Sequence, residues 1–141
     1  MNAATAAMWA GDAASPGLGM MIEAVGAATD TDTDTDTDTA TVSMSVTAAM
    51  LNGHGICHGG FVFALADSAF AYACNAYGDA AVVSHCAITY RRSCLAGARL
   101  TAVATERARE GRSGLYDVAV SADGVVMAEF RGHSRLMAAR A

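Results

Sequence analysis

The stretch Cys57–Asn75, CHGGFVFALADSAFAYACN, decides the fold of this chain. After its two glycines it is apolar on almost every side of a helix, with one acid in the middle. A helix with this pattern has no face left for water, so it cannot lie on a protein surface. Other elements of the chain therefore have to wrap around it.

The segments on either side of this helix have the pattern of β-strands. Before it, Gly19–Ala28 is apolar and Ala40–Thr47 alternates between apolar and polar residues, the period of a half-buried strand. Four further extended runs follow the helix: Ala80–Tyr90, Arg99–Arg109, Leu115–Ser121 and Val125–Ser134. An Asp-Gly turn joins the last two as a hairpin. The order predicts an α+β fold in which a curved antiparallel sheet wraps one long central helix.

The length and apolar content favour a single domain over residues 1–141. Residues 1–18 are expected to form a short N-terminal helix, Met1–Ala10, followed by a linker at Ser15-Pro16-Gly17. The Thr-Asp tract at residues 29–39 alternates too, but both of its faces are polar, so no register buries anything. We expect a flexible, solvated hairpin connection without function there, with cation binding as the alternative. The tract lacks the Gly turn and terminal Glu of a calcium loop.

Charge and cysteine usage narrow the possible partners. The net charge is −5, but five of the 14 acids are in the Thr-Asp tract, and the remaining nine balance nine basic residues. Without a basic face, binding to nucleic acid is not expected. The four cysteines form no CxxC pair and the N-terminus does not resemble a signal peptide, so we expect free thiols and a cytoplasmic protein. Polar residues interrupt the single membrane candidate, Phe61–Tyr77, and we expect no membrane span.

Asp67 is the acid in the middle of the apolar helix. An ionised carboxylate there loses several kcal/mol of hydration unless a partner compensates for it. The nearest basic residue, Arg91, lies beyond the next strand, and the only polar neighbour along the chain is the hydroxyl of Ser68. We interpret Asp67 as a catalytic base or nucleophile. The alternative is a structural acid capped by Ser68.

Gly59 and Gly60 stand at the start of the same helix. The first N–H groups of a helix have no intrahelical acceptor, and the helix dipole adds partial positive charge. With no side chain in the way, such an end suits a carbonyl oxygen that is becoming an oxyanion. The alternative is that the glycines only permit a tight turn.

The spacing of these two features indicates more than one subunit. Gly59 and Asp67 are separated by about 12 Å along one helix. Groups that act on the same carbonyl must both lie within about 3 to 3.5 Å of the reacting atoms. If both are used, a second chain must bring its Asp67 to Gly59 of the first, which predicts a two-fold homodimer.

The run Leu51–Gly78, LNGHGICHGGFVFALADSAFAYACNAYG, resembles the signature of the hotdog-fold acyl-CoA thioesterases of the phenylacetic acid degradation type. The resemblance extends over most of the chain, through MSVTAAMLNGH (Met44–His54), AGARLTA (Ala96–Ala102), GLYDVAV (Gly114–Val120) and FRGHS (Phe130–Ser134). It implies a hotdog fold, two subunits for each site and dimers that pair into tetramers. We expect no cofactor and no metal.

The resemblance also implies roles for individual residues. Asp67 would be the nucleophile or general base, and the Gly59 amide would polarise the thioester carbonyl. Asn52 and His58 would shape the site beside it. Ser68 would orient a water molecule or the carboxylate. The substrate would be an aryl-CoA or hydroxyaryl-CoA resembling phenylacetyl-CoA, hydrolysed to the free acid and CoA.

Two arginines and a set of aromatic residues each have two possible roles. Arg91 and Arg92 stand at a strand end where they can meet the CoA phosphates or form a solvated edge. The family commonly has Arg-Pro-Gly where this chain has Arg92-Ser93-Cys94, so the turn near the CoA entrance is expected to differ. Several aromatic residues are candidates for an aryl pocket or for plain core: Phe61, Phe63, Phe70, Tyr72 and Tyr77.

Three other functions are compatible with parts of the pattern. A non-catalytic hotdog module would hold an acyl thioester without cleaving it. A hotdog dehydratase would use a His together with the acid, but the His58-to-Asp67 spacing fits the thioesterase pattern better. A metal site at His54, Cys57 and His58 lacks a fourth ligand.

Overall fold

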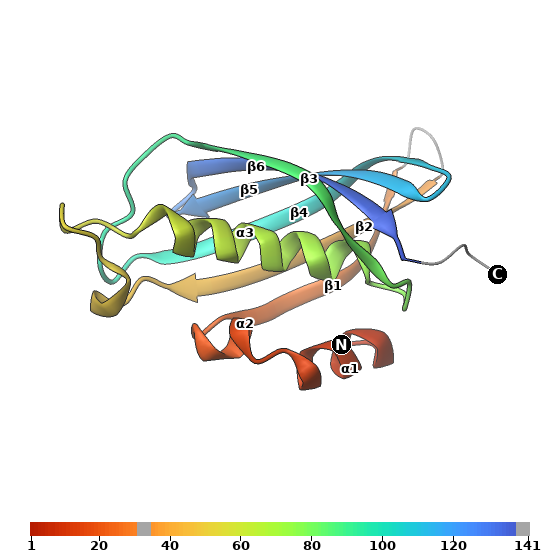
Figure 1. Ribbon diagram of the computed structural model, residues 1–141, viewed down its shortest axis with the longest axis horizontal. Coiled ribbons are helices and arrows are strands. Elements are labelled where there is room, and N and C mark those ends of the chain that lie inside the picture. The colour runs from red at the N-terminus through yellow and green to blue at the C-terminus, as the bar shows by residue number, and fades with distance from the viewer. Residues whose placement is uncertain (31–34, 138–141) are drawn as a thin grey trace.

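In the computed structural model, which describes residues 1–30 and 35–137, six antiparallel strands form one sheet that curves around the long helix α3 (Figure 1). The elements are α1 (Ala3–Gly11), α2 (Ala14–Gly17), β1 (Met21–Asp30), β2 (Thr35–Ser45), a 3₁₀ turn (Ala48–Met50), α3 (Gly59–Cys74), β3 (Ala81–Tyr90), β4 (Arg99–Glu110), β5 (Ser113–Ala122) and β6 (Val125–Leu136). The strand order is β1-β2-β4-β5-β6-β3. This α+β architecture is the hotdog fold, and it confirms the predicted order of elements.

Both ends of α3 are held by polar side chains. At the start, the His58 side chain accepts a hydrogen bond from the Gly60 N–H at 3.1 Å and caps the helix. At the end, Asn75 donates to the carbonyls of Ala71 and Ala81 and accepts from the Ala81 N–H at 2.8 Å. Asn75 thus ties the last turn of the helix to the first residue of β3.

The core lies between α3 and the concave face of the sheet. Small side chains at Ala66, Ala69 and Ala73 let the helix approach the strands closely, and all three are buried. Phe70 fills the space between the helix and the strands, and its ring contacts those of Tyr116 and Phe130. The remaining buried side chains of this layer include Val42, Met44, Leu65, Leu100, Ala102, Val118 and Val120.

The sheet does not enclose the whole helix. Phe63, Asp67 and Ala71, which follow one another at intervals of four residues, are only half-buried, and so is Ala64 beside them. Residues spaced in this way lie on one stripe of a helix. A single chain therefore leaves one mostly apolar flank of α3 partly open, with Asp67 at its middle.

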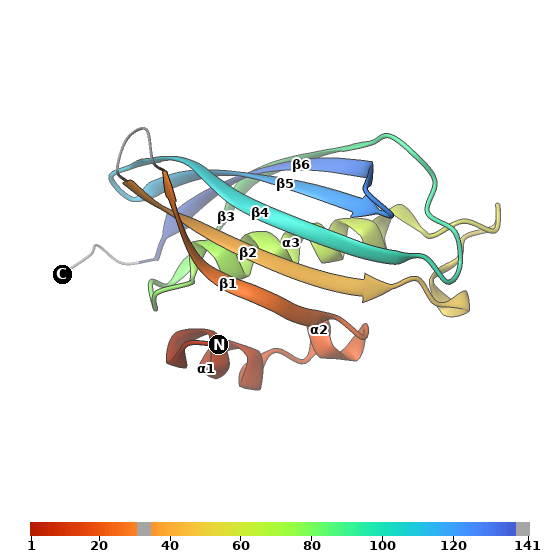
Figure 2. The same cartoon turned by 180° about the vertical axis from the view of Figure 1, so that it is seen from behind.

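The N-terminal segment packs along a neighbouring stripe of α3. Asn2 donates to the Ala76 carbonyl at 2.8 Å, and the Tyr72 hydroxyl donates to Asp12 Oδ2 at 2.9 Å. Both views of the ribbon place α1 and α2 next to β1 at the edge of the sheet (Figures 1 and 2). The predicted N-terminal helix is confirmed.

The predicted linker at residues 15–17 is instead part of the short helix α2. Proline is compatible with a first helical turn because the N–H that it lacks would have no partner there. Asp12 Oδ1 also accepts a hydrogen bond from the Ser15 N–H at 2.9 Å, which stabilises the turn.

The contact between Asp12 and Tyr72 should make stability depend on pH. Burial raises the pKa of Asp12, but hydrogen bonds from Ser15 and Tyr72 outweigh it, so the pKa lies below the ordinary 3.8. Such a carboxylate stabilises the fold above its unfolded pKa and loses this effect as the pH falls through the folded pKa. Asp12→Ala should lower the free energy of unfolding by about 1 to 3 kcal/mol at pH 7.

Urea unfolding at pH 7 and at pH 3 measures this effect, and the difference between wild type and variant should shrink at the lower pH. In a Tyr72→Phe background, Asp12→Ala should cost less, since the hydroxyl to be satisfied is gone. If Asp12→Ala lowered the free energy of unfolding equally in both backgrounds, the hydrogen bond between Asp12 and Tyr72 would not contribute to stability.

The Thr-Asp tract differs from the loop predicted over residues 29–39, because much of it belongs to strands β1 and β2. Strand β1 runs to Asp30 and β2 begins at Thr35, with Asp30 paired to Thr35, while residues 31–34 lie outside the described residues. The ladder is made by backbone groups, so a tract that is polar on both faces can still extend a hairpin. Asp38 is also more than a solvated acid, because Arg109 forms ion pairs with both Asp38 and Glu106.

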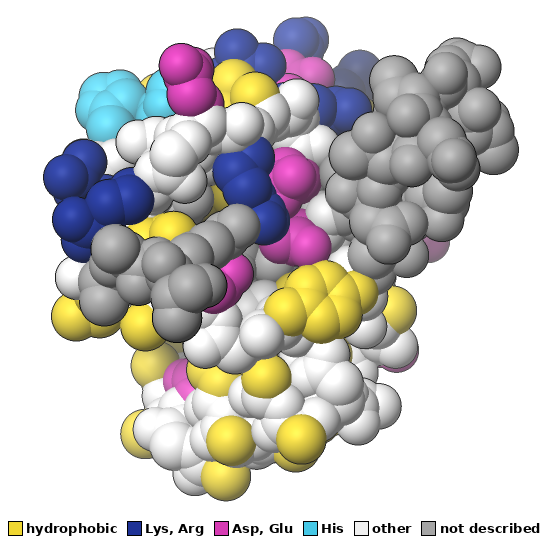
Figure 3. All heavy atoms as spheres, turned by 90° about the vertical axis from the view of Figure 1, so that its right-hand side faces the viewer, with side chains coloured by type: hydrophobic (Ala, Val, Ile, Leu, Met, Phe, Trp, Pro, Cys, Tyr) yellow, Lys and Arg dark blue, Asp and Glu magenta, His cyan; other side chains and the backbone are white. Residues whose placement is uncertain are grey.

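Charges of both signs share the surface. On the face shown in Figure 3, basic and acidic side chains lie next to one another, while apolar side chains gather over the N-terminal helices below. None of the helices in residues 1–30 and 35–137 has the length and apolar character needed to cross a bilayer.

Candidate functional site

The start of α3 presents one backbone N–H group without an acceptor. The Gly60 N–H donates to His58 Nδ1, and the Phe61 N–H donates to the His58 carbonyl at 3.0 Å. The Gly59 N–H has no acceptor among the described residues. His58 therefore satisfies the next two amides of the helix and leaves that of Gly59 available to a ligand.

Gly59 lines a pocket of about 290 Å³ between the start of α3, the loop before it and the end of β3. The pocket brings together four residues that the sequence singles out: Asn52, Gly59, Arg91 and Arg92. The other lining residues are Ile56, Cys57, Val62, Tyr90, Ser93 and Cys94.

Asn52 organises the loop that forms one wall of this pocket. Its Oδ1 accepts hydrogen bonds from the N–H groups of His54 and Ile56, at 2.9 and 3.4 Å. Its backbone N–H donates to the Ile56 carbonyl at 2.8 Å. The side-chain NH₂ of Asn52 has no acceptor among the described residues, so it remains free for a ligand in the pocket.

Arg91 and Arg92 are exposed and already hold local partners. Arg91 Nε pairs with Glu129 Oε2 at 2.8 Å, and Arg92 Nη1 donates to the Val126 carbonyl at 2.8 Å. Surface pairs of this kind contribute little to stability, so an anionic ligand can replace them at low cost. The two guanidinium groups thus place positive charge at one edge of the Gly59 pocket.

Asp67 is half-buried and has no hydrogen bond or ion pair with any residue that the structure describes. Burial raises its pKa above the ordinary 3.8, because removing water disfavours the charged form. The idea that Ser68 caps this carboxylate is not supported, since the Ser68 hydroxyl bonds instead with the buried Ser15 at 2.9 Å. Asp67 is left as a carboxylate with a raised pKa and no partner in the described part of the chain.

One chain does not bring Asp67 to the Gly59 pocket. Asp67 is absent from the lining of that pocket, and eight residues of continuous helix, or about 12 Å, separate it from Gly59. Ser68, bonded to the N-terminal segment, is also apart from the pocket. The structure therefore assembles one half of the predicted site and leaves the acid on the open flank of α3.

Tyr90 is a residue at this site that the sequence does not reveal. Its hydroxyl donates to the Gly59 carbonyl at 2.9 Å, and its side chain lines the same pocket. The only local signal is an aromatic residue with a polar tip at a strand end, next to Arg91. The contact joins residues 31 positions apart, which no short-range pattern can predict.

The candidate aryl-pocket residues divide by burial. Phe70 and Tyr72 are core residues, and Tyr77 lies beyond the far end of α3 and is 59% exposed. Phe61 and Phe63 are half-buried, so only these two remain able to meet a ligand.

The proposed metal ligands at residues 54–58 have separate environments. His54 is exposed, Cys57 is buried and His58 caps α3. Within residues 1–30 and 35–137, no group of three or more His, Cys, Asp and Glu side chains is placed to hold a metal ion.

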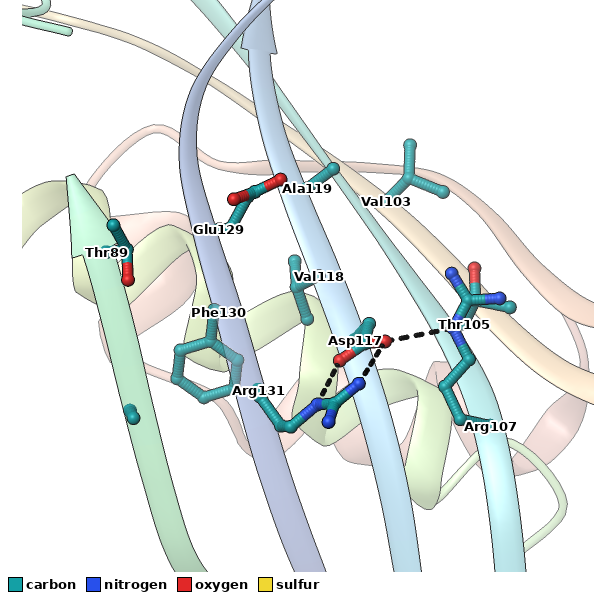
Figure 4. A pocket seen from close by; sticks show the side chains of 11 residues that line it. Thr89, Val103, Thr105, Arg107, Asp117, Val118, Ala119, Glu129, Phe130 and Arg131 are labelled. Carbon is teal, nitrogen blue, oxygen red and sulfur yellow. Dashed lines mark hydrogen bonds and ion pairs between the residues drawn. The ribbon is translucent and has the colours of Figure 1, made fainter. Parts of the chain in front are cut away.

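A larger pocket, of about 490 Å³, lies on the outer face of the sheet over β3 to β6 (Figure 4). At its centre, Asp117 accepts hydrogen bonds from Arg131 at 2.7 and 3.0 Å and from Arg107 at 3.1 Å. Asp117 offsets one of the two arginine charges, and no residue of the segment from Asn52 to Ser68 lines this pocket. The smaller pocket at Gly59 is therefore the better candidate site.

The fold and the site together define a hotdog protein whose central helix begins at a glycine amide and carries one acid, both without a partner among residues 1–30 and 35–137. The chain belongs to the thioesterase superfamily, whose family model matches residues 54–128. It is 52% identical over 90 residues to the acyl-coenzyme A thioesterase PaaI of Escherichia coli K12. That alignment covers 63% of this chain and 64% of the relative, so it spans somewhat less than two thirds of the curated protein.

Solved structures agree over a longer span. The E. coli PaaI protein from the phenylacetic acid degradation operon matches with a TM-score of 0.83 and 41% identity, over 96% of this chain and 92% of that one. A mutant of the phenylacetic acid degradation protein PaaI from Thermus thermophilus matches with a TM-score of 0.79 and 36% identity, over 89% of this chain and 100% of that one.

Proposed function

We propose that this protein is an acyl-CoA thioesterase that hydrolyses an aryl-CoA or hydroxyaryl-CoA, such as phenylacetyl-CoA, to the free acid and CoA. The observation that carries the proposal is the pair of unsatisfied groups on one helix, the Gly59 amide and the Asp67 carboxylate. The E. coli relative is named an acyl-coenzyme A thioesterase, and its operon serves phenylacetic acid degradation. These names favour an aryl thioester as the substrate.

Two chains build each site in this proposal. Asp67 of one subunit meets the Gly59 pocket of the other, and the partner covers the half-open flank of α3. Strand β3 lies at the edge of the sheet, and its residues Val82, Val83 and Tyr90 are exposed. An exposed, partly apolar edge strand is suited to pairing with a second copy. By family resemblance, such dimers pair further into tetramers.

In the proposed reaction, the backbone amide of Gly59 holds the carbonyl of the thioester. The thioester oxygen accepts a hydrogen bond from the Gly59 N–H, which stabilises the negative charge that develops when the carbon is attacked. In one route, Asp67 takes a proton from water while the water oxygen bonds to the carbon. In the other, a carboxylate oxygen of Asp67 attacks and forms a mixed anhydride, which water then cleaves. In both, the C–S bond breaks and CoA leaves as a thiolate.

A single turnover in ¹⁸O-water distinguishes direct attack by water from an anhydride that water cleaves at the Asp67 carbonyl. If water attacks directly, all of the label enters the free acid. If Asp67 attacks and water then cleaves the anhydride at the Asp67 carbonyl, one ¹⁸O atom enters the carboxylate of Asp67, where peptide mass spectrometry detects it.

The function itself is tested by thiol release. Benzoyl-, phenylacetyl-, hydroxyphenylacetyl-, acetyl- and hexanoyl-CoA should be incubated with the protein, and free CoA followed with a thiol reagent. We expect release, fastest with the aryl substrates. Binding of these thioesters without release from any of them would favour the non-catalytic module.

All four cysteines are free, as suits a reducing compartment, and we place the enzyme in the cytoplasm.

Arg91 and Arg92 are proposed to bind the CoA phosphates. Arg92→Ala should raise KM for an acyl-CoA about five- to tenfold at low salt, because one charge-assisted contact is lost. The matched substrate is the same acyl group on N-acetylcysteamine, which has no phosphate, and its KM should stay unchanged. An equal effect on both substrates would show that Arg92 acts on the acyl end or on the fold.

A further inference from the structure

We propose that Tyr90 is a positioning residue, which together with His58 clamps the Gly59–Gly60 peptide and so orients the Gly59 amide toward the thioester oxygen. This inference rests on the proposed function, and it extends the site by a residue from a different element. Tyr90 stands at the end of β3, whereas the amide that it serves begins α3.

The peptide that joins Gly59 to Gly60 is held at both of its polar atoms. Its carbonyl oxygen accepts a hydrogen bond from the Tyr90 hydroxyl at 2.9 Å. Its N–H donates to His58 Nδ1 at 3.1 Å. The two side chains therefore restrain the rotation of this peptide, while the preceding N–H, that of Gly59, stays unpaired.

This restraint matters because two consecutive glycines are a flexible place to build an oxyanion donor. Glycine loses more backbone freedom on folding than any other residue. An amide stabilises a developing charge effectively only when it is already oriented before the reaction. Without the clamp, rotation about the Gly59 backbone would turn the amide away from the carbonyl oxygen for part of the time.

The contact also accounts for a glycine at position 59. A Cβ atom there would lie 3.1 Å from both Cζ and Oη of Tyr90, closer than side chains normally approach. A Cβ atom at position 59 would require the Tyr90 ring to shift by a few tenths of an ångström, which disturbs its hydrogen bond to the Gly59 carbonyl. Gly59 is thus needed for the approach of Tyr90 as well as for access to the amide.

Tyr90 is not held in place as a core residue. Its side chain is 50% exposed, so burial alone does not determine its position. Its hydroxyl is committed to the Gly59 carbonyl, and the leaving thiolate needs no strong acid, so a role as general acid is not required. A positioning role explains why a half-exposed tyrosine points its hydroxyl at this particular peptide.

Tyr90→Phe tests the proposal, because it keeps the ring and removes only the hydrogen bond. We expect kcat to fall about tenfold, less than the 10²- to 10³-fold effect of losing an oxyanion donor outright. KM should stay within twofold and Tm should be unchanged. Tyr77→Phe is the matched control, because Tyr77 lies at the far end of α3 and its variant should match wild type in kcat.

A second readout does not depend on activity. Hydrogen exchange of the Gly60 amide, followed by NMR, should be faster in Tyr90→Phe, because one end of the clamped peptide is released. If wild type cleaves no acyl-CoA, the proposed function fails, and this exchange rate still decides the clamp. The positioning role would be overturned if Tyr90→Phe kept the wild-type kcat or left the exchange rate of the Gly60 amide unchanged. It would also be overturned if the fall in kcat came with a lowered Tm, because the fold would then be affected.

Discussion

Asp67→Asn is expected to lower kcat/KM for phenylacetyl-CoA by about 10²- to 10⁴-fold, the range that a positioned base contributes. The amide keeps the size of the side chain but can neither accept a proton from water nor attack a thioester. Steady-state thiol release measures the loss. The same variant should still bind substrate, because neither the Gly59 amide nor the arginines at the pocket edge are altered.

The stability of the same variant should move in the opposite direction. Burial raises the pKa of Asp67 above the ordinary 3.8, so at neutral pH the ionised carboxylate destabilises the folded state. This destabilisation is complete above the folded pKa and disappears as the pH falls below the unfolded pKa. Asp67→Asn should therefore have a Tm at pH 7 equal to or above that of wild type, with the difference narrowing toward pH 4.

The pH profile of the wild-type enzyme follows from the same shift. Asp67 acts in its ionised form in both routes, so kcat/KM should fall as the pH drops through the raised pKa.

An inactive Asp67→Asn variant with a lowered Tm would indicate misfolding instead of lost chemistry. Activity equal to that of wild type would remove Asp67 from the mechanism.

Phe70→Ala should lower the free energy of unfolding by about 3 to 5 kcal/mol, which is a large part of the stability of a small domain. Phe70 is 1% exposed, and its ring lies 5.4 Å from that of Tyr116 and 5.7 Å from that of Phe130, measured between centroids. It also covers Gly132, where an added Cβ would lie 2.7 Å from the Phe70 ring. The deletion leaves a cavity between α3 and the sheet.

Urea denaturation of Phe70→Ala and Tyr77→Ala compares a buried with an exposed aromatic residue near the same helix. Because Tyr77 is exposed, Tyr77→Ala should lower the free energy of unfolding by no more than about 0.5 kcal/mol. Similar losses for both variants would mean that the layer between α3 and the sheet is not the main core.

The architecture was predictable because its signals are local. A helix that is apolar all round, followed by four extended runs, leaves few packings other than a sheet around the helix. The strand extension of the Thr-Asp tract was not predictable, since a strand with two polar faces carries no hydrophobic pattern, although its backbone pairs in regular register. The folding of residues 14–17 into a helical turn depends on Asp12, which no periodicity indicates.

Half of the site was predictable for the same reason. Gly59 and Asp67 stand out within one helical stretch, and their spacing predicts a second subunit if both act on the same carbonyl. The hydrogen bonds of Tyr90 to Gly59 and of Ser68 to Ser15 join residues 31 and 53 positions apart. Contacts of this kind follow from how the strands and the N-terminal segment pack on α3, so they become visible only in the folded chain.

Gly59→Pro and Asp67→Asn supply the subunits for a test of the proposed site, in which two chains each contribute one group. Proline has no N–H and suits the first position of a helix, so Gly59→Pro removes the oxyanion donor while α3 keeps its first turn, and its Cβ also displaces the Tyr90 ring. Each variant alone should be inactive. When equal amounts are mixed after unfolding and refolded together, half of the dimers are mixed, and each mixed dimer holds one intact site.

Refolded wild type treated in the same way provides the reference rate of thiol release from phenylacetyl-CoA. The mixture should reach about one quarter of that rate, because half of the dimers carry half of their sites. A mixture no more active than either parent would contradict a site made from Gly59 of one chain and Asp67 of another.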